Sequence, residues 1–98
     1  MPFENCASQS FTAASIRKNA PECHGIYGLS NAREWIFIGE SRDLRATLME
    51  RLREVGTSVA LRNPTGFSFE RLSPGDCTLR QNQLIRELQP SCNRRVRA

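Results

Sequence analysis

Hydrophobic and polar positions alternate with a helical period over residues 41–54. One apolar stripe, spaced i, i+4, i+8 and i+11, consists of Leu44, Leu48, Leu52 and Val55. Charged residues occupy most of the other positions, which is the pattern of an amphipathic surface helix. Ser41 is expected to cap the N-terminus of this helix, and Gly56 is expected at the position that follows its C-terminus.

A second strong helix is predicted near the end of the chain. A Ser-Pro-Gly-Asp sequence opens it, with Asp76 as the expected cap, and Pro90 ends it. One face of this helix carries Cys77, Gln81, Ile85 and Leu88, with Leu84 beside them. A shorter helix is expected over residues 10–18, capped by Ser10 or Thr12.

Three segments have the composition of β-strands. Residues 25–29 and 35–39 are separated by a short polar loop, which predicts a β-hairpin. The second of these runs is apolar at four consecutive positions, which favours a central strand covered on both faces. Residues 67–71 alternate between apolar and polar and predict a third strand, whereas residues 58–61 fit a helix or a strand equally well.

The predicted order of elements is α-β-β-α-(α or coil)-β-α. It corresponds to the α+β class, with a small three-stranded antiparallel sheet flanked by helices. A chain of 98 residues is one domain, too short for a doubly wound dinucleotide-binding fold or a TIM barrel.

The charge of the chain is unevenly distributed. Its formal net charge is +4, with thirteen arginines and one lysine. Residues 42–98 carry +5 and residues 1–41 carry −1. Arginine presents a planar fork of donors that suits phosphate, so this excess points to nucleic acid as a partner. Genome composition is the alternative source of the bias.

Neither a membrane nor a zinc site is expected. No apolar run approaches 18 residues, and the N-terminal sequence lacks the pattern of a secretory signal, so we expect a cytoplasmic protein with reduced cysteines. Zinc sites usually contain a close pair of ligands, but no C-x-x-C occurs, and neighbours such as Cys23 and His24 seldom reach one ion together.

Three short motifs resemble those of the GIY-YIG nuclease superfamily. They are Gly25-Ile26-Tyr27, then Phe37-Ile38-Gly39, and a closing helix whose Pro90 is followed by Asn93. The resemblance implies a GIY-YIG-like domain over residues 20–93. An N-terminal extension with a short helix (1–19) would precede this domain, and a basic tail (94–98) would follow it.

The resemblance also implies a chemistry and a set of site positions. Members of the superfamily cut phosphodiesters with one divalent metal ion, commonly Mg²⁺. Tyr27 matches the tyrosine of the first motif, whereas Phe37 replaces the tyrosine of the second. Thr47 stands at the position of the helix arginine, Arg51 at the position of a His or Tyr one turn later, and Gln81 at the position of the metal-binding glutamate.

Two charged groups of the family's catalytic set are therefore missing. Threonine cannot compensate phosphate charge, and a neutral amide cannot hold Mg²⁺ as a carboxylate does. We expect a catalytically degraded domain without a metal ion, and Mg²⁺ as cofactor only if an active nuclease survives with a rearranged site. Glu40 is the best replacement ligand, ahead of the other candidates Asp43, Glu70 and Glu87.

Arg45 and Arg51 are the candidate phosphate-binding residues, with further backbone contacts from Arg94, Arg95 and Arg97. Three functions remain open. The first is a nuclease-like domain that binds nucleic acid, DNA rather than RNA, without efficient cleavage. The second is an active metal-dependent endonuclease, and the third is a protein-interaction module with no nucleic-acid role. The oligomeric state is not defined by the sequence.

Overall fold

The computed structural model describes residues 8–93. Four strands form one antiparallel sheet in the order β1-β4-β2-β3. The elements are β1 (Gln9–Ser10), α1 (Ala13–Asn19), β2 (Gly25–Ser30), β3 (Trp35–Ser41), α2 (Leu44–Arg53), α3 (Ser58–Leu61), β4 (Gly66–Arg71) and α4 (Pro74–Leu88).

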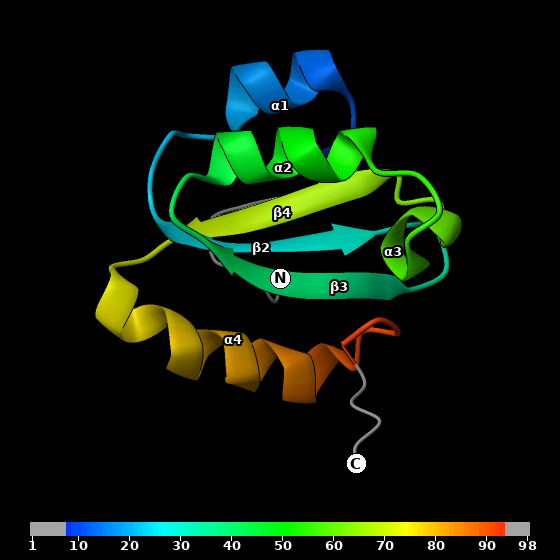
Figure 1. Ribbon diagram of the computed structural model, residues 1–98. Coiled ribbons are helices and arrows are strands. Elements are labelled where there is room, and N and C mark those ends of the chain that lie inside the picture. The colour runs from blue at the N-terminus through cyan, green and yellow to red at the C-terminus, as the bar shows by residue number, and fades with distance from the viewer. Residues whose placement is uncertain (1–7, 94–98) are drawn as a thin grey trace.

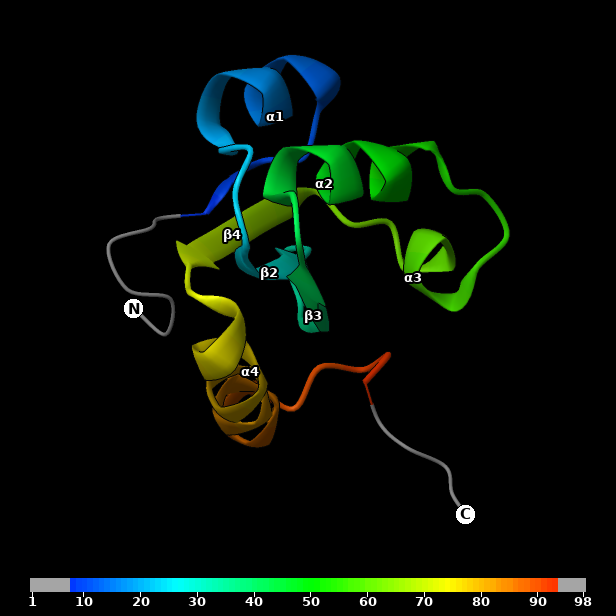
Figure 2. The ribbon, with the colours of Figure 1, turned by 60° about the vertical axis from the view of Figure 1, so that its left-hand side comes forward.

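Helices cover both faces of the sheet (Figure 1). α1 and α2 lie on one face and α4 lies on the other, which the rotated view of Figure 2 also shows. Each face has its own buried cluster. The α2 face includes Tyr27, Leu29, Leu44, Leu48 and Phe67. The α4 face is smaller and consists of Ile26, Ile38, Cys77 and Leu84, with partly buried side chains around them.

The α+β class is confirmed, but the sheet has four strands where the sequence predicts three. The additional strand β1 pairs Gln9 with Phe67 of β4. Two polar residues give no alternating pattern, so β1 left no signal in the sequence. Phe11 follows it, is 8% exposed, and packs edge-on against Phe67 with ring centroids 6.4 Å apart. Residues 9–19 thus pack on the same core as the rest of the domain.

The prediction that residues 35–39 form a central strand is wrong. Within the described sheet β2 is central and β3 is an edge strand. β3 is apolar on both faces because α2 and α4 cover it from opposite sides (Figure 1). Residues 91–93 cover its open edge, where the amides of Ser91 and Cys92 donate to the carbonyls of Trp35 and Ile36. An apolar run indicates that both faces of a strand are covered, but it does not show whether another strand pairs with each of its edges.

The predicted cap and stop of α2 are also wrong. Asp43, rather than Ser41, caps the helix and accepts from the amide of Ala46 at 3.1 Å. The helix ends at Arg53, so Val55 lies outside it and is 87% exposed. Gly56 has φ of +80°, but it belongs to the turn that leads into α3, three residues after the end of α2.

α4 begins one turn earlier than predicted. Ser73 is its N-cap and Pro74 its first residue, while Asp76 lies in the first turn and accepts from the Ser73 hydroxyl. α1 is capped by Thr12, as one of the two alternatives predicted, and residues 58–61 are a helix. Between residues 8 and 93, no helix has both the length and the apolar character needed to cross a bilayer.

Candidate functional site

Tyr27 lies in the central strand β2 and points to the α2 face of the sheet. Its side chain is almost fully buried, with 1% of the residue exposed. Its ring packs against Phe37 of β3, with centroids 6.1 Å apart. Gly39 permits this arrangement, because a Cβ at that position would come within 2.8 Å of the Tyr27 hydroxyl and of the Phe37 ring. The glycine of the second motif therefore makes room for the tyrosine of the first.

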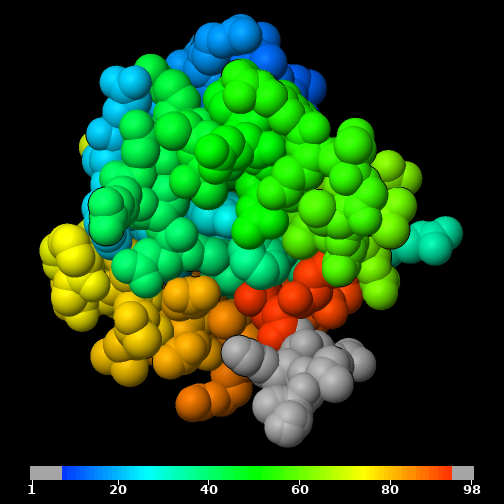
Figure 3. All heavy atoms as spheres, in the orientation of Figure 1, coloured from blue at the N-terminus to red at the C-terminus, as the bar shows by residue number. Residues whose placement is uncertain are grey.

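The Arg51 guanidinium covers the Tyr27 hydroxyl. Its Nε donates to Tyr27 Oη at 3.1 Å, and its central carbon lies 4.6 Å from the centroid of the Phe37 ring. Its Nη1 pairs with Glu54 at 3.3 Å, and the Arg51 side chain remains 25% exposed. Figure 3 shows a shallow hollow between α2 and β3, with atoms of β2 at its floor. Arg51 is thus fixed by three neighbours and still open to solvent.

Burial controls the acid–base state of this pair. Desolvation raises the pKa of the Tyr27 phenol above its ordinary value, and the positive charge of Arg51 opposes this only in part. Burial alone would lower the pKa of Arg51, but the interactions with Tyr27 and Glu54 outweigh it and raise that pKa overall. At neutral pH the site therefore holds a neutral phenol beside a cation.

Thr47, which the resemblance puts at the position of the family's helix arginine, makes a structural contact. It lies one turn before Arg51 on α2, so both side chains share a face of the helix. The Thr47 hydroxyl is 2.5 Å from the hydroxyl of Ser41 at the end of β3. Ser41 in turn accepts from the amide of Asp43 at 2.9 Å. These contacts tie the strand to the helix and supply no positive charge.

Gln81 and Asn93 meet at the backbone of Ile38. Asn93 accepts from the Ile38 amide at 2.6 Å and donates to the Ile38 carbonyl at 3.0 Å. Gln81 of α4 donates to the same carbonyl at 3.4 Å. The Asn93 carboxamide thereby satisfies both backbone groups at the open edge of β3, as a neighbouring strand would.

The residues at the predicted site positions do not all converge. Tyr27, Phe37 and Arg51 are in mutual contact on the α2 face. Arg45 lies elsewhere, because its Nε donates to the carbonyl of Ala20 at 2.9 Å and its Nη1 lies 3.6 Å from Glu22. Arg45 is six positions before Arg51 on α2, so the two side chains point about 120° apart around the helix.

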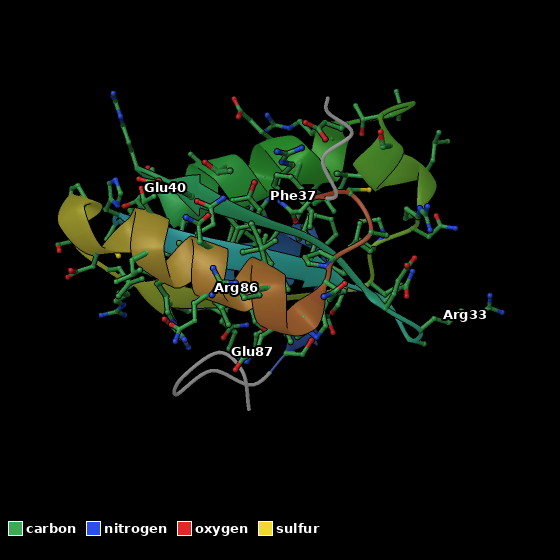
Figure 4. The ribbon with its side chains drawn as sticks, turned by 90° about the horizontal axis from the view of Figure 1, so that it is seen from below. Arg33, Phe37, Glu40, Arg86 and Glu87 are labelled. Carbon is green, nitrogen blue, oxygen red and sulfur yellow. The ribbon has the colours of Figure 1, made fainter. Side chains whose placement is uncertain are left out.

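The acidic candidates are likewise scattered. Glu40 lies on β3, while Glu87 lies on α4 and apart from it (Figure 4). Asp43 caps α2, and Glu70 pairs with Arg80 at 2.8 Å. A lone neutral amide such as that of Gln81 does not fit Mg²⁺, which is held by carboxylate oxygens.

The sequence did not predict one cluster of potential metal ligands. His24, Glu40 and Cys77 lie together on the α4 face, and they are the one group of three or more potential metal ligands among residues 8–93. Part of it was foreseeable. Glu40 pairs with Ile26 in the hairpin, which puts it diagonal to His24 on the same face. Cys77 comes from α4, 53 residues beyond His24, and its approach depends on tertiary packing.

A comparison with protein-family models finds no match, and a comparison with curated protein sequences finds none either. Solved structures do match. They are of the GIY-YIG N-terminal endonuclease domain of UvrC from Thermotoga maritima, bound to its catalytic divalent cation. For two point mutants the TM-score is 0.68 at 24% and 25% identity, covering 82% and 81% of this chain and 96% of the other. For the magnesium-bound domain the TM-score is 0.67 at 22% identity, covering 81% and 96%.

The chain therefore has a GIY-YIG-like nuclease fold. The likeness covers most of both chains and agrees with the resemblance of the three motifs. At this level of identity it establishes the fold, and the function has to be argued from the side chains at the site.

Proposed function

We propose that this protein is a catalytically degraded GIY-YIG nuclease-like domain that binds the phosphate backbone of DNA without cutting it efficiently. The observation that carries the proposal is the Arg51 guanidinium, which lies against Tyr27 and Phe37 where the fold's site is expected. It combines a fixed position with a partly exposed positive charge.

The geometry of Arg51 suits a phosphate. Tyr27 occupies Nε and Glu54 occupies Nη1, and among the described residues no partner is bonded to Nη2. A guanidinium held by packing loses little conformational freedom when it binds an anion. Glu54 competes for the same cation, so it weakens phosphate binding while it orients the arginine.

The same contacts argue against efficient cleavage. A general base must be able to accept a proton from water, whereas Tyr27 is 1% exposed, covered by Arg51, and neutral at neutral pH. The Thr47 hydroxyl is hydrogen-bonded to the hydroxyl of Ser41, and the Gln81 amide donates to the carbonyl of Ile38. Removing a single charged partner of the transition state typically costs about a hundredfold or more in rate, and here two are absent.

A salt titration of binding to a short DNA duplex tests the proposal. Affinity should fall with salt concentration, because phosphate contacts release counterions. Arg51→Gln should weaken binding and reduce the slope of log K against log salt by about 1. Glu54→Gln should strengthen binding, because it removes the competing carboxylate and leaves Arg51 in place.

Arg86→Gln is the matched control. Arg86 is exposed on α4, far from Phe37 on β3 (Figure 4). Equal losses in Arg51→Gln and Arg86→Gln would indicate diffuse attraction to the basic chain and contradict a site at Arg51. Tighter binding to an RNA duplex than to a DNA duplex would identify RNA as the partner. No binding at low salt would contradict a nucleic-acid function.

A reversion tests whether the scaffold has lost only its catalytic groups. In the double variant Thr47→Arg/Gln81→Glu, we expect metal-dependent nicking of plasmid DNA above the wild-type level. Circular dichroism should show an unchanged fold. Folded but inactive double variants, together with active wild-type protein, would favour the alternative of a rearranged nuclease site.

A further inference from the structure

We propose that His24, Glu40 and Cys77 form a binding site for a transition-metal ion of the Zn²⁺ type. This site uses other residues than the Mg²⁺ position that the resemblance implies at Gln81, which lies one helical turn after Cys77 on α4, and it does not depend on DNA binding. Three ligand types from three segments converge there: His24 precedes β2, Glu40 belongs to β3, and Cys77 lies in the first turns of α4.

The geometry of the three side chains fits one ion. The Cys77 sulfur is 3.3 Å from His24 Nδ1, and a Glu40 oxygen is 3.6 Å from Nε2, the other nitrogen of the same ring, so an ion bound by one of these nitrogens requires one of the two partners to move toward it. One ligand atom from each residue can be chosen so that all three lie within 4.8 Å of one another. Ligands at the usual Zn–S and Zn–N distances of about 2.3 and 2.0 Å stand roughly 3.3–3.8 Å apart. Rotation of the Glu40 side chain, which is 36% exposed, can close the difference.

The local electrostatics favour a cation. Burial raises the pKa of the Cys77 thiol, and the negative charges of Glu40 and Asp76 raise it further. A bound divalent ion reverses this balance, because it stabilises the thiolate and neutralises the carboxylates. The same residue types also occur in nucleophile–base relays, but Cys77 has no exposed surface from which its sulfur could attack a substrate. These features suit a small ion better than an attack on a substrate.

The ligand set selects the class of metal. Thiolate and imidazole prefer Zn²⁺ and its neighbours, whereas Mg²⁺ prefers carboxylates and water. Three protein ligands leave one position of a tetrahedral ion free. The partial exposure of His24 (21%) and Glu40 (36%) opens that position to solvent. The site would therefore hold the metal with one water molecule or one exogenous ligand.

Titration of the reduced protein with Zn²⁺, and separately with Co²⁺ as a spectroscopic probe, tests this site. We expect one ion per chain, a thiolate-to-cobalt charge-transfer band, and a higher melting temperature with Zn²⁺. Cys77→Ser and His24→Gln should each weaken Zn²⁺ binding at least about 100-fold, since even the loss of outer-shell partners costs 10–100-fold. Glu40→Gln should weaken it less, because the amide keeps an oxygen ligand.

Matched variants separate this site from others in the chain. Cys23→Ser and Cys92→Ser remove partly buried thiols, and Gln81→Ala removes the side chain at the Mg²⁺ position, so all three should bind Zn²⁺ like the wild type. Because His24 is partly exposed, its variant should keep the fold and the wild-type circular dichroism spectrum. Absence of Zn²⁺ binding, or binding that is unchanged in His24→Gln and Cys77→Ser but lost in Cys23→Ser, would overturn the proposal.

Discussion

The two faces of the β2–β3 hairpin carry different side-chain chemistry. On the α2 face, residues at the predicted site positions make contacts within the fold: Thr47 binds Ser41, and Arg51 covers Tyr27. On the α4 face, Glu40 approaches His24 and Cys77 at the rim of a small apolar cluster. The first face presents a hydroxyl and a guanidinium in these contacts, and the second presents the softer ligand set of an imidazole, a carboxylate and a thiol.

Residues of the motifs that resemble those of the family also serve the packing of the fold. Tyr27, Gly39 and Asn93 are motif residues, and each has a packing reason to be there. Tyr27 fills the core, Gly39 leaves room for its hydroxyl, and Asn93 closes the edge of β3. The motif that identifies the fold is therefore compatible with loss of the activity.

The largest expected effect tests whether the two faces form one cooperative unit. Leu48→Ala on the α2 face and Leu84→Ala on the α4 face should each lower the free energy of unfolding by about 2–5 kcal/mol, because both side chains are fully buried. Leu79→Ala is the control in α4, since Leu79 is 77% exposed and should change stability by less than about 0.5 kcal/mol. Urea denaturation measures all three. Separate transitions for the two leucine variants would show that the faces unfold independently.

The second prediction concerns the open edge of β3, where Asn93 binds the backbone of Ile38. Asn93→Ala removes both side-chain bonds to Ile38 and should cost about 1–3 kcal/mol of unfolding free energy. Asn82→Ala, at an exposed position of α4, should be nearly neutral. Equal stability of the two variants in urea would mean that the carboxamide is not needed to close the edge.

The cap of α2 fixes the helix that carries the α2-face site. Asp43→Ala should lower the unfolding free energy by about 1 kcal/mol, the usual value of an N-cap. Asp43→Asn preserves an accepting oxygen and should recover most of that loss. If Asp43→Asn is as unstable as Asp43→Ala in urea, charge and not the capping bond holds the helix.

The smallest effect concerns the protonation of Tyr27, the only tyrosine in the chain. Its pKa is raised in the folded state by burial, so the unfolded chain ionises first as the pH increases. The stability contributed by the neutral phenol is complete below pH of about 10 and is lost as the pH rises toward the folded pKa. Phenolate absorbance should titrate at a higher pH in native protein than in denaturant. Coincident curves would show that Tyr27 is accessible to solvent.

Local patterns predicted much of the fold, and tertiary relations account for what they missed. The hairpin, both long helices and the strand predicted over residues 67–71 follow from periodicity and turn residues, whereas the predicted N-caps of both long helices were wrong. The edge position of β3 did not follow, because an apolar run cannot show which strand pairs beyond it. Motif spacing predicted site roles for Tyr27 and Arg51, but the hydrogen bond between them arises only when α2 packs on the sheet. The approach of Cys77 to His24 depends on α4 in the same way.

We propose that the GIY-YIG-like site of this chain holds phosphate without cutting it. Incubation of supercoiled plasmid with Mg²⁺ or Mn²⁺, at a protein concentration that saturates DNA binding, tests this proposal. We expect no nicked product above the protein-free control. Metal-dependent nicking by the wild-type protein that disappears in Tyr27→Phe protein would contradict it.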